Sequence, residues 1–186
     1  MILEGNDPAT QPSFSMGNRL ARALWGVTWM LLFRPSPRPL HAWRRALLRL
    51  FGARMGEHVH VYAGVRIWAP WQLTLGDRVG IADGVTLYNM APMTIGNDCT
   101  LSQGAYLCGG SHDINSANFQ LVAHPIKLAD HVWVCAEAFV GPGVYIASGC
   151  VVGARAVVMK DINQPWTVWG GHPAVQLKAR RPRSST

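Results

Sequence analysis

The sequence predicts a mainly β protein: a parallel β-helix of six-residue repeats that follows two N-terminal helices and ends in a short tail. Aliphatic residues recur every six positions along much of the chain after Gly56, and a small or β-branched residue usually stands four positions after each of them. This period fits neither the 3.6-residue helical period nor simple strand alternation. Repetition at a fixed short period is typical of a solenoid, in which each repeat packs on the next.

The composition is that of one globular domain with basic ends. The chain has 186 residues, of which 49% are hydrophobic and 15% are charged. Lysine and arginine number 17 against 10 aspartate and glutamate residues, a net charge of +7, and the excess lies in segments 19–54 and 178–183. Such ends suit nucleic acid, an anionic membrane or a phosphorylated cofactor. Nucleic acid is the least favoured partner, since no zinc-finger spacing or RNA-binding signature is present.

The cysteines and the N-terminus favour a reduced, cytoplasmic protein. No Cys-x-x-Cys pair and no signal-peptide pattern is present. The longest apolar run, 23–33, is shorter than the roughly 20 residues needed to cross a bilayer. All the cysteines occupy small-residue positions of the repeat, which favours a structural role over a reactive one. They are Cys99, Cys108, Cys135 and Cys150.

Residues 1–57 are expected to form a tail and two helices. Residues 1–16 are polar and predicted to be poorly ordered. Helical spacing predicts a first helix over 17–33, ended by "RPSPRP", and a second between Pro39 and Gly52. The apolar stripes are Leu20, Leu24, Val27 and Leu31 in the first helix, and Leu40, Trp43, Leu47 and Leu50 in the second. We expect these stripes to cover one end of the main domain; the alternative is a basic amphipathic helix lying on the inner membrane face.

Residues 58–163 carry the repeat, and 164–186 form a C-terminal tail. The repeating aliphatic residues are Leu75, Ile81, Leu87, Ile95, Leu101, Leu107, Leu128, Val134, Val140, Ile146, Val152 and Val158. Each hexapeptide supplies a short strand and a corner, so three of them close a triangular coil. Stacking the coils pairs identical positions in parallel strands roughly 4.8 Å apart, with the aliphatic residues forming an interior column.

The repeat breaks between Leu107 and Leu128, where the sequence reads "CGGSHDINSANFQLVAHPIKLAD". Polar composition predicts that a loop, at about 113–125, leaves the column here. Long loops held by a rigid scaffold commonly carry function. His112 stands at the point of departure and is therefore a candidate functional residue.

The motifs "WAPWQLTLGD", "LSQGAYLCGGSHD", "PIKLADHVWV", "VVGARAVVMKDI" and "WGGHPAVQLKAR" resemble those of hexapeptide-repeat acyltransferases, in particular the acetyltransferases of colanic acid and related exopolysaccharide synthesis. The likeness extends from about residue 17 to residue 180. It implies a left-handed parallel β-helix, a homotrimer, and acetyl-CoA-dependent O-acetylation of a sugar hydroxyl on a glycan acceptor. It implies direct transfer, without a metal or an acyl-enzyme.

The resemblance also implies roles for individual residues. It assigns His112 as the general base that removes the proton of the attacking hydroxyl; a histidine that only caps the loop is the alternative. Acceptor binding falls to Asn89, Gln103 and Asp113, and the first two are also common corner residues. Backbone groups of Ala136 and Ala154 would contact the pantetheine arm, and Lys160 and Lys178 the CoA phosphates. His124 and His131 are expected at the surface or an interface.

Three positions depart from the family pattern. Asp113 stands where the maltose and galactoside branch has proline, His172 where "GGNPA" is usual, and Met159 where threonine is usual. Two other functions fit the repeat: a γ-carbonic-anhydrase-like zinc enzyme, which needs three converging histidines, and a non-catalytic membrane-associated scaffold. Cys108 also leaves open a covalent acyl-cysteine route.

Overall fold

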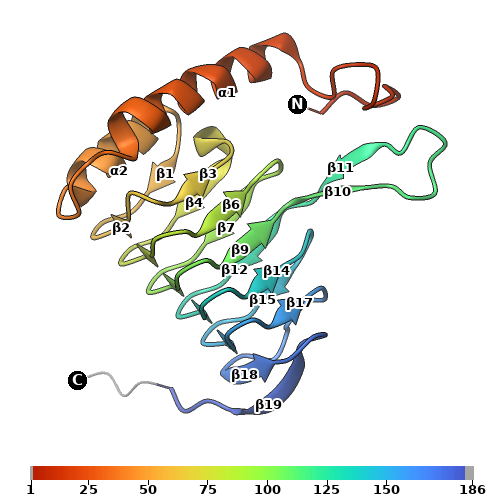
Figure 1. The fold of residues 1–186 in the computed structure, drawn as a ribbon. Coiled ribbons are helices and arrows are strands. Elements are labelled where there is room, and N and C mark those ends of the chain that lie inside the picture. The colour runs from red at the N-terminus through yellow and green to blue at the C-terminus, as the bar shows by residue number, and fades with distance from the viewer. Residues whose placement is uncertain (1, 183–186) are drawn as a thin grey trace.

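The computed structural model describes residues 2–182, which form a triangular column capped at one end by helices (Figure 1). Five complete coils of three strands each are stacked within these residues. Their strands are β1 (Arg54–Met55), β2 (His60–Val61), β3 (Arg66–Ile67), β4 (Leu73–Leu75), β5 (Gly80–Ile81), β6 (Thr86–Tyr88), β7 (Met93–Ile95), β8 (Thr100–Leu101), β9 (Tyr106–Cys108), β12 (Ile126–Leu128), β13 (Trp133–Val134), β14 (Phe139–Val140), β15 (Tyr145–Ile146), β16 (Val151–Val152) and β17 (Val157–Val158).

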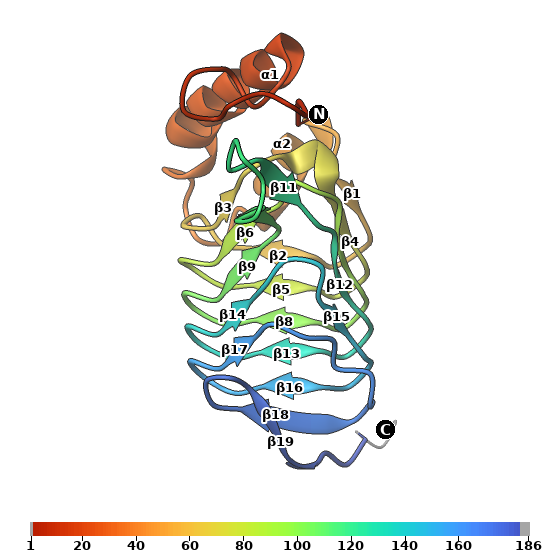
Figure 2. The same ribbon diagram turned by 90° about the vertical axis from the view of Figure 1, so that its right-hand side faces the viewer.

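The column has three faces, each a parallel sheet, and among the described strands only the second face ends in an antiparallel strand. The first face has the order β1-β4-β7-β12-β15, and the third has β17-β14-β9-β6-β3. The second face runs β19-β18-β16-β13-β8-β5-β2 (Figure 2), where β18 (Thr167–Gly170) continues the parallel sheet and β19 (Val175–Ala179) closes it antiparallel. The parallel stacking of hexapeptide strands is therefore confirmed.

The interior column is the one the period predicts. Ile81, Leu101 and Val134 lie in register on the second face and are fully buried. Adjacent strands bring identical positions together, so each aliphatic side chain packs on its equivalents above and below. Val61 and Ile67 extend this column by one coil beyond the repeats assigned from the sequence, since their coil precedes Leu75.

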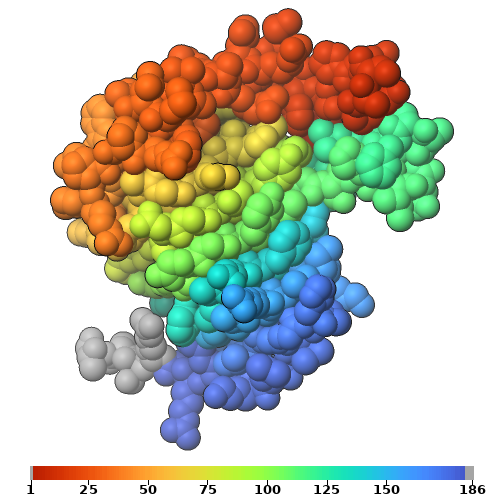
Figure 3. Space-filling model, viewed as in Figure 1, coloured from red at the N-terminus to blue at the C-terminus, as the bar shows by residue number. Residues whose placement is uncertain are grey.

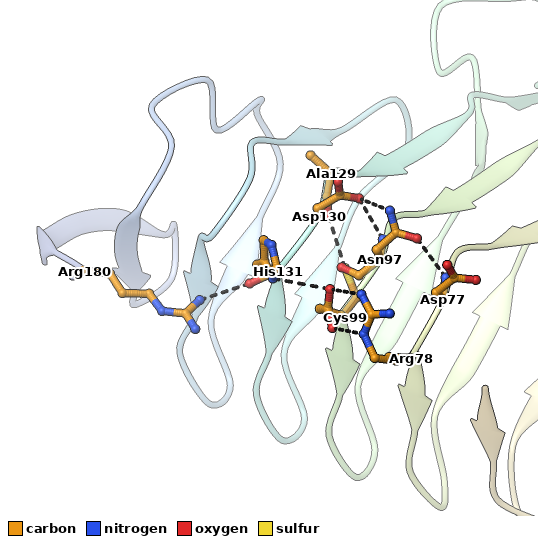
Figure 4. Close-up of polar contacts among 9 residues, drawn as sticks. Asp77, Arg78, Asn97, Cys99, Ala129, Asp130, His131 and Arg180 are labelled. Carbon is orange, nitrogen blue, oxygen red and sulfur yellow. Dashed lines mark hydrogen bonds and ion pairs between the residues drawn. The ribbon is translucent and has the colours of Figure 1, made fainter. Parts of the chain in front are cut away.

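Three edges join the faces, and polar residues stabilise the edge between the first and second faces. There, Asp77, Asn97 and Asp130 stack in successive coils, as Figure 4 shows. The amide nitrogen of Asp77 donates to Asn97 Oδ1 at 2.8 Å, and that of Asn97 donates to Asp130 Oδ1 at 2.7 Å. Each side chain therefore satisfies a backbone donor of the preceding coil, which accounts for the carboxylates of this edge structurally.

Helices cover the N-terminal end of the column, but with a different face from the one predicted. Helix α1 (Met16–Thr28) continues through a π-helical turn (Trp29–Phe33), and α2 (His41–Leu50) follows. Trp25 and Phe33 are buried against the column, and the Trp25 indole donates to the Ile67 carbonyl at 2.7 Å. The predicted stripe of α1 is exposed instead, each member at 50% or more. Its members are Leu20, Leu24, Val27 and Leu31.

In α2 the prediction is wrong for part of the stripe. Leu47 is buried, whereas Leu50 is 79% exposed and the fully buried Arg44 takes a place in the interface. The Arg44 guanidinium donates to the carbonyls of Val61, Pro37 and Arg38 at 2.6 to 2.9 Å. A guanidinium carries five donors, so Arg44 connects α2, the turn before it and the first coil.

The predicted excursion is a β-hairpin that projects from the edge between the third and first faces (Figure 1). Strands β10 (Gly110–His112) and β11 (Leu121–Ala123) pair antiparallel, and residues 113–120 form the tip. Residues 2–15, for which we predicted poor order, instead form a looped segment that contacts this hairpin (Figure 3). Among residues 2–182, no helix is long and apolar enough to cross a membrane.

Candidate active site

His112 ends β10 and is half-buried at the base of the hairpin tip. Its Nδ1 lies 2.8 Å from the carbonyl oxygen of Phe119, and its ring stacks on the Phe119 ring with centroids 4.4 Å apart and an interplanar angle of 11°. The carbonyl can only accept, so Nδ1 carries the proton and Nε2 presents a lone pair. The hairpin therefore holds the imidazole in the tautomer that a general base requires.

Asn89 lies at the same edge, one coil before the hairpin, and is fully buried. Its Nδ2 donates to the Ala69 carbonyl at 2.7 Å, and its Oδ1 accepts from the Ala69 amide at 3.0 Å. The side chain thus pairs with the backbone of the preceding coil as a strand would. An acceptor hydroxyl could contact Asn89 only through its second N–H or second lone pair, and its assignment to acceptor binding stays a prediction.

The two alanines assigned to the pantetheine arm, Ala136 and Ala154, form a single row with Gln103, on the edge between the second and third faces. The amide of Glu137 donates to the Gln103 carbonyl at 2.9 Å, and that of Arg155 donates to the Ala136 carbonyl at 3.0 Å. Gln103, Ala136 and Ala154 therefore occupy equivalent corner positions in three successive coils. We call this the alanine edge, and we call the edge from which β10–β11 projects the hairpin edge.

Within one chain, the residues of the alanine edge stand apart from His112 and Asn89 at the hairpin edge. Strand β9 runs from the corner that holds Gln103 to the hairpin that holds His112, so the two edges flank the third face. Lys160 follows β17 at the hairpin edge, whereas Lys178 lies in β19 at the end of the second face, and both are exposed. The lysines share the C-terminal end of the column but lie on different sides of it.

Aromatic side chains form a row along the third face, from one coil to the next, between these edges. Tyr88, Tyr106 and Phe139 lie in three successive coils, with ring centroids 6.4 Å apart for the first pair and 5.6 Å for the second. Burial is the largest influence that raises the pKa of the Tyr106 hydroxyl to about 12. The phenol is therefore neutral at physiological pH and available as a hydrogen-bond donor.

A cleft of about 900 Å³ lies on the first-face side of the hairpin, between the hairpin, the N-terminal segment and the column. Asp113 lines it, with polar side chains from all three parts. The Asp113 carboxylate also accepts from the Asn115 amide at 2.9 Å, which shapes the hairpin tip. The other polar residues that line the cleft are Glu4, Asn18, Gln72, Ser116, Asn118, Gln120 and His124.

The cysteines are free thiols, and all lie within the described part of the chain. Cys99 and Cys150 are buried, and burial raises the pKa of Cys99 to about 12. The half-buried Cys108 donates to the Gly110 carbonyl at 3.3 Å. Within residues 2–182, no three histidine, cysteine or acidic side chains gather in a way that could hold a metal ion. His112 lies in the hairpin and His124 at its exit, whereas His131 follows Asp130 at the edge between the first and second faces, so the three do not converge.

Sequence reasoning missed Phe119, which both accepts from His112 and stacks on it. It is the one aromatic residue in the otherwise polar segment "DINSANFQ". A single aromatic residue in a polar surface loop indicates a specific contact, so the sequence did contain a signal for Phe119. Its backbone φ of 49° in the left-handed region could not be read from the sequence.

Comparison with known proteins places this chain among acetyltransferases. It is 42% identical over 167 residues to a putative colanic acid biosynthesis acetyltransferase of Escherichia coli K12, covering 90% of this chain and 91% of the relative. It is 26% identical over 155 residues to the galactoside O-acetyltransferase of Escherichia coli K12, covering 82% and 76%. No protein-family model matches the chain.

Solved structures agree with this placement. A hexapeptide-repeat acetyltransferase from Vibrio cholerae O1 biovar eltor, complexed with acetyl-coenzyme A, superimposes with a TM-score of 0.83 at 25% identity, covering 92% of this chain and 93% of the other. These likenesses confirm the left-handed parallel β-helix. The chain therefore belongs to the hexapeptide-repeat acetyltransferases, in the family of the colanic acid biosynthesis acetyltransferases.

Proposed function

We propose that this protein transfers the acetyl group of acetyl-CoA to a sugar hydroxyl during the synthesis of an exopolysaccharide or a related glycan. The observation that carries the proposal is the imidazole of His112, held by the Phe119 carbonyl with Nε2 free to accept a proton. A sugar hydroxyl is a poor nucleophile at neutral pH, so it needs such a base as it attacks a thioester. The similarity to named acetyltransferases supports this function over a zinc enzyme or a non-catalytic scaffold.

The reaction needs one proton carrier. Nε2 of His112 takes the hydroxyl proton while the oxygen bonds to the acetyl carbonyl carbon; the carbon–sulfur bond then breaks, and the thiol of CoA receives the proton. Direct transfer requires no acyl-enzyme. The Cys108 thiol lies in β9 and donates to the Gly110 carbonyl of β10, and it is not needed as a nucleophile.

We place the pantetheine arm along the alanine edge. Small side chains at Ala136 and Ala154 leave the corner backbone accessible, and a row of equivalent corners gives an extended ligand repeated hydrogen-bonding groups. Lys160 and Lys178, both exposed at the C-terminal end of the column, have the charge to bind the phosphates of CoA. The acceptor glycan would lie near Asp113 in the cleft beside the hairpin, whose volume suits a small-molecule ligand.

The test is the variant His112→Asn, assayed with acetyl-CoA and a panel of sugar acceptors. Calorimetry should find acetyl-CoA binding unchanged, while kcat falls by about 10² to 10⁴, or roughly 3 to 5 kcal/mol of transition-state stabilisation. His58→Asn is the matched control, because His58 is exposed in the first coil and its left-handed backbone tolerates asparagine. Retention of more than about a tenth of wild-type kcat by His112→Asn would exclude it as the base.

We further propose a homotrimer that packs third face to third face. The alanine edge and the hairpin edge flank this face, so a threefold arrangement would bring His112 of each chain near the alanine edge of the next. The half-buried rings of Tyr106 and Phe139 give the face an apolar surface to bury. In analytical ultracentrifugation, Phe139→Glu should dissociate the assembly, and Trp133→Glu on the second face should not.

We propose that the protein is cytoplasmic, since free thiols fit a reducing compartment. We also propose that its N-terminal helices contact the inner membrane face. The α1 stripe exposes large apolar side chains, and Arg19 and Arg34 are also exposed. Apolar residues beside basic ones suit an anionic interface. Leu24→Glu should reduce co-sedimentation with anionic lipid vesicles, whereas Leu177→Glu, equally exposed at the opposite end, should leave it unchanged.

A further inference from the structure

The hairpin that carries His112 has little apolar support of its own. Ile114 is 78% exposed and Phe119 is 53% exposed, and β10 and β11 pair with each other and with no other strand of the described chain. A two-stranded hairpin is at best marginally stable by itself. The position of the proposed base therefore depends on whatever else contacts residues 113–120.

The N-terminal segment makes that contact, more than 100 residues away in sequence. The Gly5 amide donates to Gln120 Oε1 at 2.9 Å, and Gln120 Nε2 donates to the Leu3 carbonyl at 3.3 Å. Beside them, Asn118 Nδ2 donates to the Asn6 carbonyl at 3.0 Å and to Gln120 Oε1 at 3.1 Å. Figure 3 shows the N-terminal segment lying against the hairpin.

Gln120 also connects this contact to the base. Its backbone is fixed within the tip: the Gln120 amide donates to Ser116 Oγ at 2.7 Å, and the Gln120 carbonyl accepts from the Asp113 amide at 2.8 Å. It directly follows Phe119, whose carbonyl fixes His112 Nδ1. A shift of Gln120 therefore displaces the acceptor that sets both the orientation and the tautomer of the imidazole.

We propose that residues 3–6 act as a strut for the His112 hairpin and that Gln120 is the positioning residue through which the strut holds the base. The inference rests on the proposed function, since it gives His112 a proton to remove. The strut contributes no reacting group. It acts by keeping Nε2 in the geometry required for proton transfer, where a misplacement of about 1 Å can cost as much as 10²-fold in rate.

Two variants remove the contact from opposite sides: Gln120→Ala, and deletion of residues 2–6. Each should lower kcat at saturating substrate by about 10- to 100-fold, with KM for acetyl-CoA and the unfolding temperature nearly unchanged. Combining them should cost no more than either alone. Gln11→Ala is the control, because Gln11 is exposed in the same segment. Hydrogen exchange should become faster at 113–120 in both variants and stay unchanged in the control.

A double-mutant cycle separates positioning from a merely structural role. In the His112→Asn background, Gln120→Ala should have no further effect on the residual rate, because the group it positions is gone. A loss of the same size in both backgrounds, or a kcat within twofold of wild type in both single variants, would overturn the proposal. A fully active His112→Asn would instead defeat the assigned base, and hydrogen exchange would still report whether the strut holds the hairpin.

Discussion

The column and the hairpin are stabilised in opposite ways. In the column, Leu101 lies between Ile81 and Val134, its equivalents in the neighbouring coils, and all three are fully buried. In the hairpin, Ile114 and Phe119 are largely exposed, and hydrogen bonds made by Gln120 and His112 fix the tip. Repetition makes the column stable, while the hairpin's order depends on contacts that occur once. The proposed chemistry uses the second region and is held in place by the first.

The largest expected effect is on the column. Leu101→Ala removes a side chain that the coils above and below cannot replace, so it should lower the free energy of unfolding by about 2–5 kcal/mol. Ile114→Ala in the hairpin tip should change it by less than about 0.5 kcal/mol, since that side chain is exposed. Denaturant titration of both variants measures the difference. Equal losses would mean that the hairpin is part of the cooperative core.

A smaller effect is expected on activity from the hairpin. Phe119→Ala removes the ring that stacks on His112 but keeps the carbonyl that accepts from Nδ1. An aromatic pair contributes about 0.5–1.5 kcal/mol, so kcat should fall by about 2- to 12-fold if that energy orients the base. The unfolding free energy should change little. Steady-state kinetics beside denaturant titration tests this, and a stability loss as large as that of Leu101→Ala would remove the contrast between the two regions.

The same contrast explains what the sequence could predict. The six-residue period specifies the column, because in a stacked coil a residue's position in the repeat determines its neighbours. It also placed the excursion close to His112, although the chain leaves the column two residues earlier, at Gly110. It could not predict that Gln120 would bind a segment more than 100 residues away, because no period relates the two.

The helical cap was predictable only in part. Spacing tells which residues share a helix face but not which face a neighbour covers, so the stripe containing Leu24 was assigned to the interface and is exposed. Trp25 and Trp29 make the contact instead, since their indoles donate to carbonyls of the first coil at 2.7 and 2.8 Å. The burial of Asn89 could not be predicted from the sequence either, because a polar corner residue has the same spacing whether it binds a ligand or the preceding coil.

The smallest expected effect concerns the joint between cap and column, at His41. Burial lowers the pKa of His41, and the nearby Arg44, His60 and Arg45 lower it further, against an opposing influence of the Val61 carbonyl. His41 Nδ1 lies 3.0 Å from the Val61 carbonyl, which can only accept, and 3.1 Å from Arg44 Nη2, which can only donate. A proton on Nδ1 therefore satisfies the first contact and opposes the second, and a charged imidazole would face the Arg44 guanidinium.

The pH dependence follows from the direction of that shift. Because the folded state binds the proton less well than the unfolded chain, the contribution of His41 to stability is present above about pH 6.5 and is lost as the pH falls through the lower, folded-state pKa. Unfolding midpoints measured between pH 8 and pH 5 should therefore fall less in His41→Gln than in the wild type. His58→Gln, at an exposed position in the first coil, should retain the wild-type dependence. If His41→Gln keeps the full dependence as well, the acid sensitivity arises elsewhere, and the contact between α2 and the first coil depends on Arg44 without help from the charge state of His41.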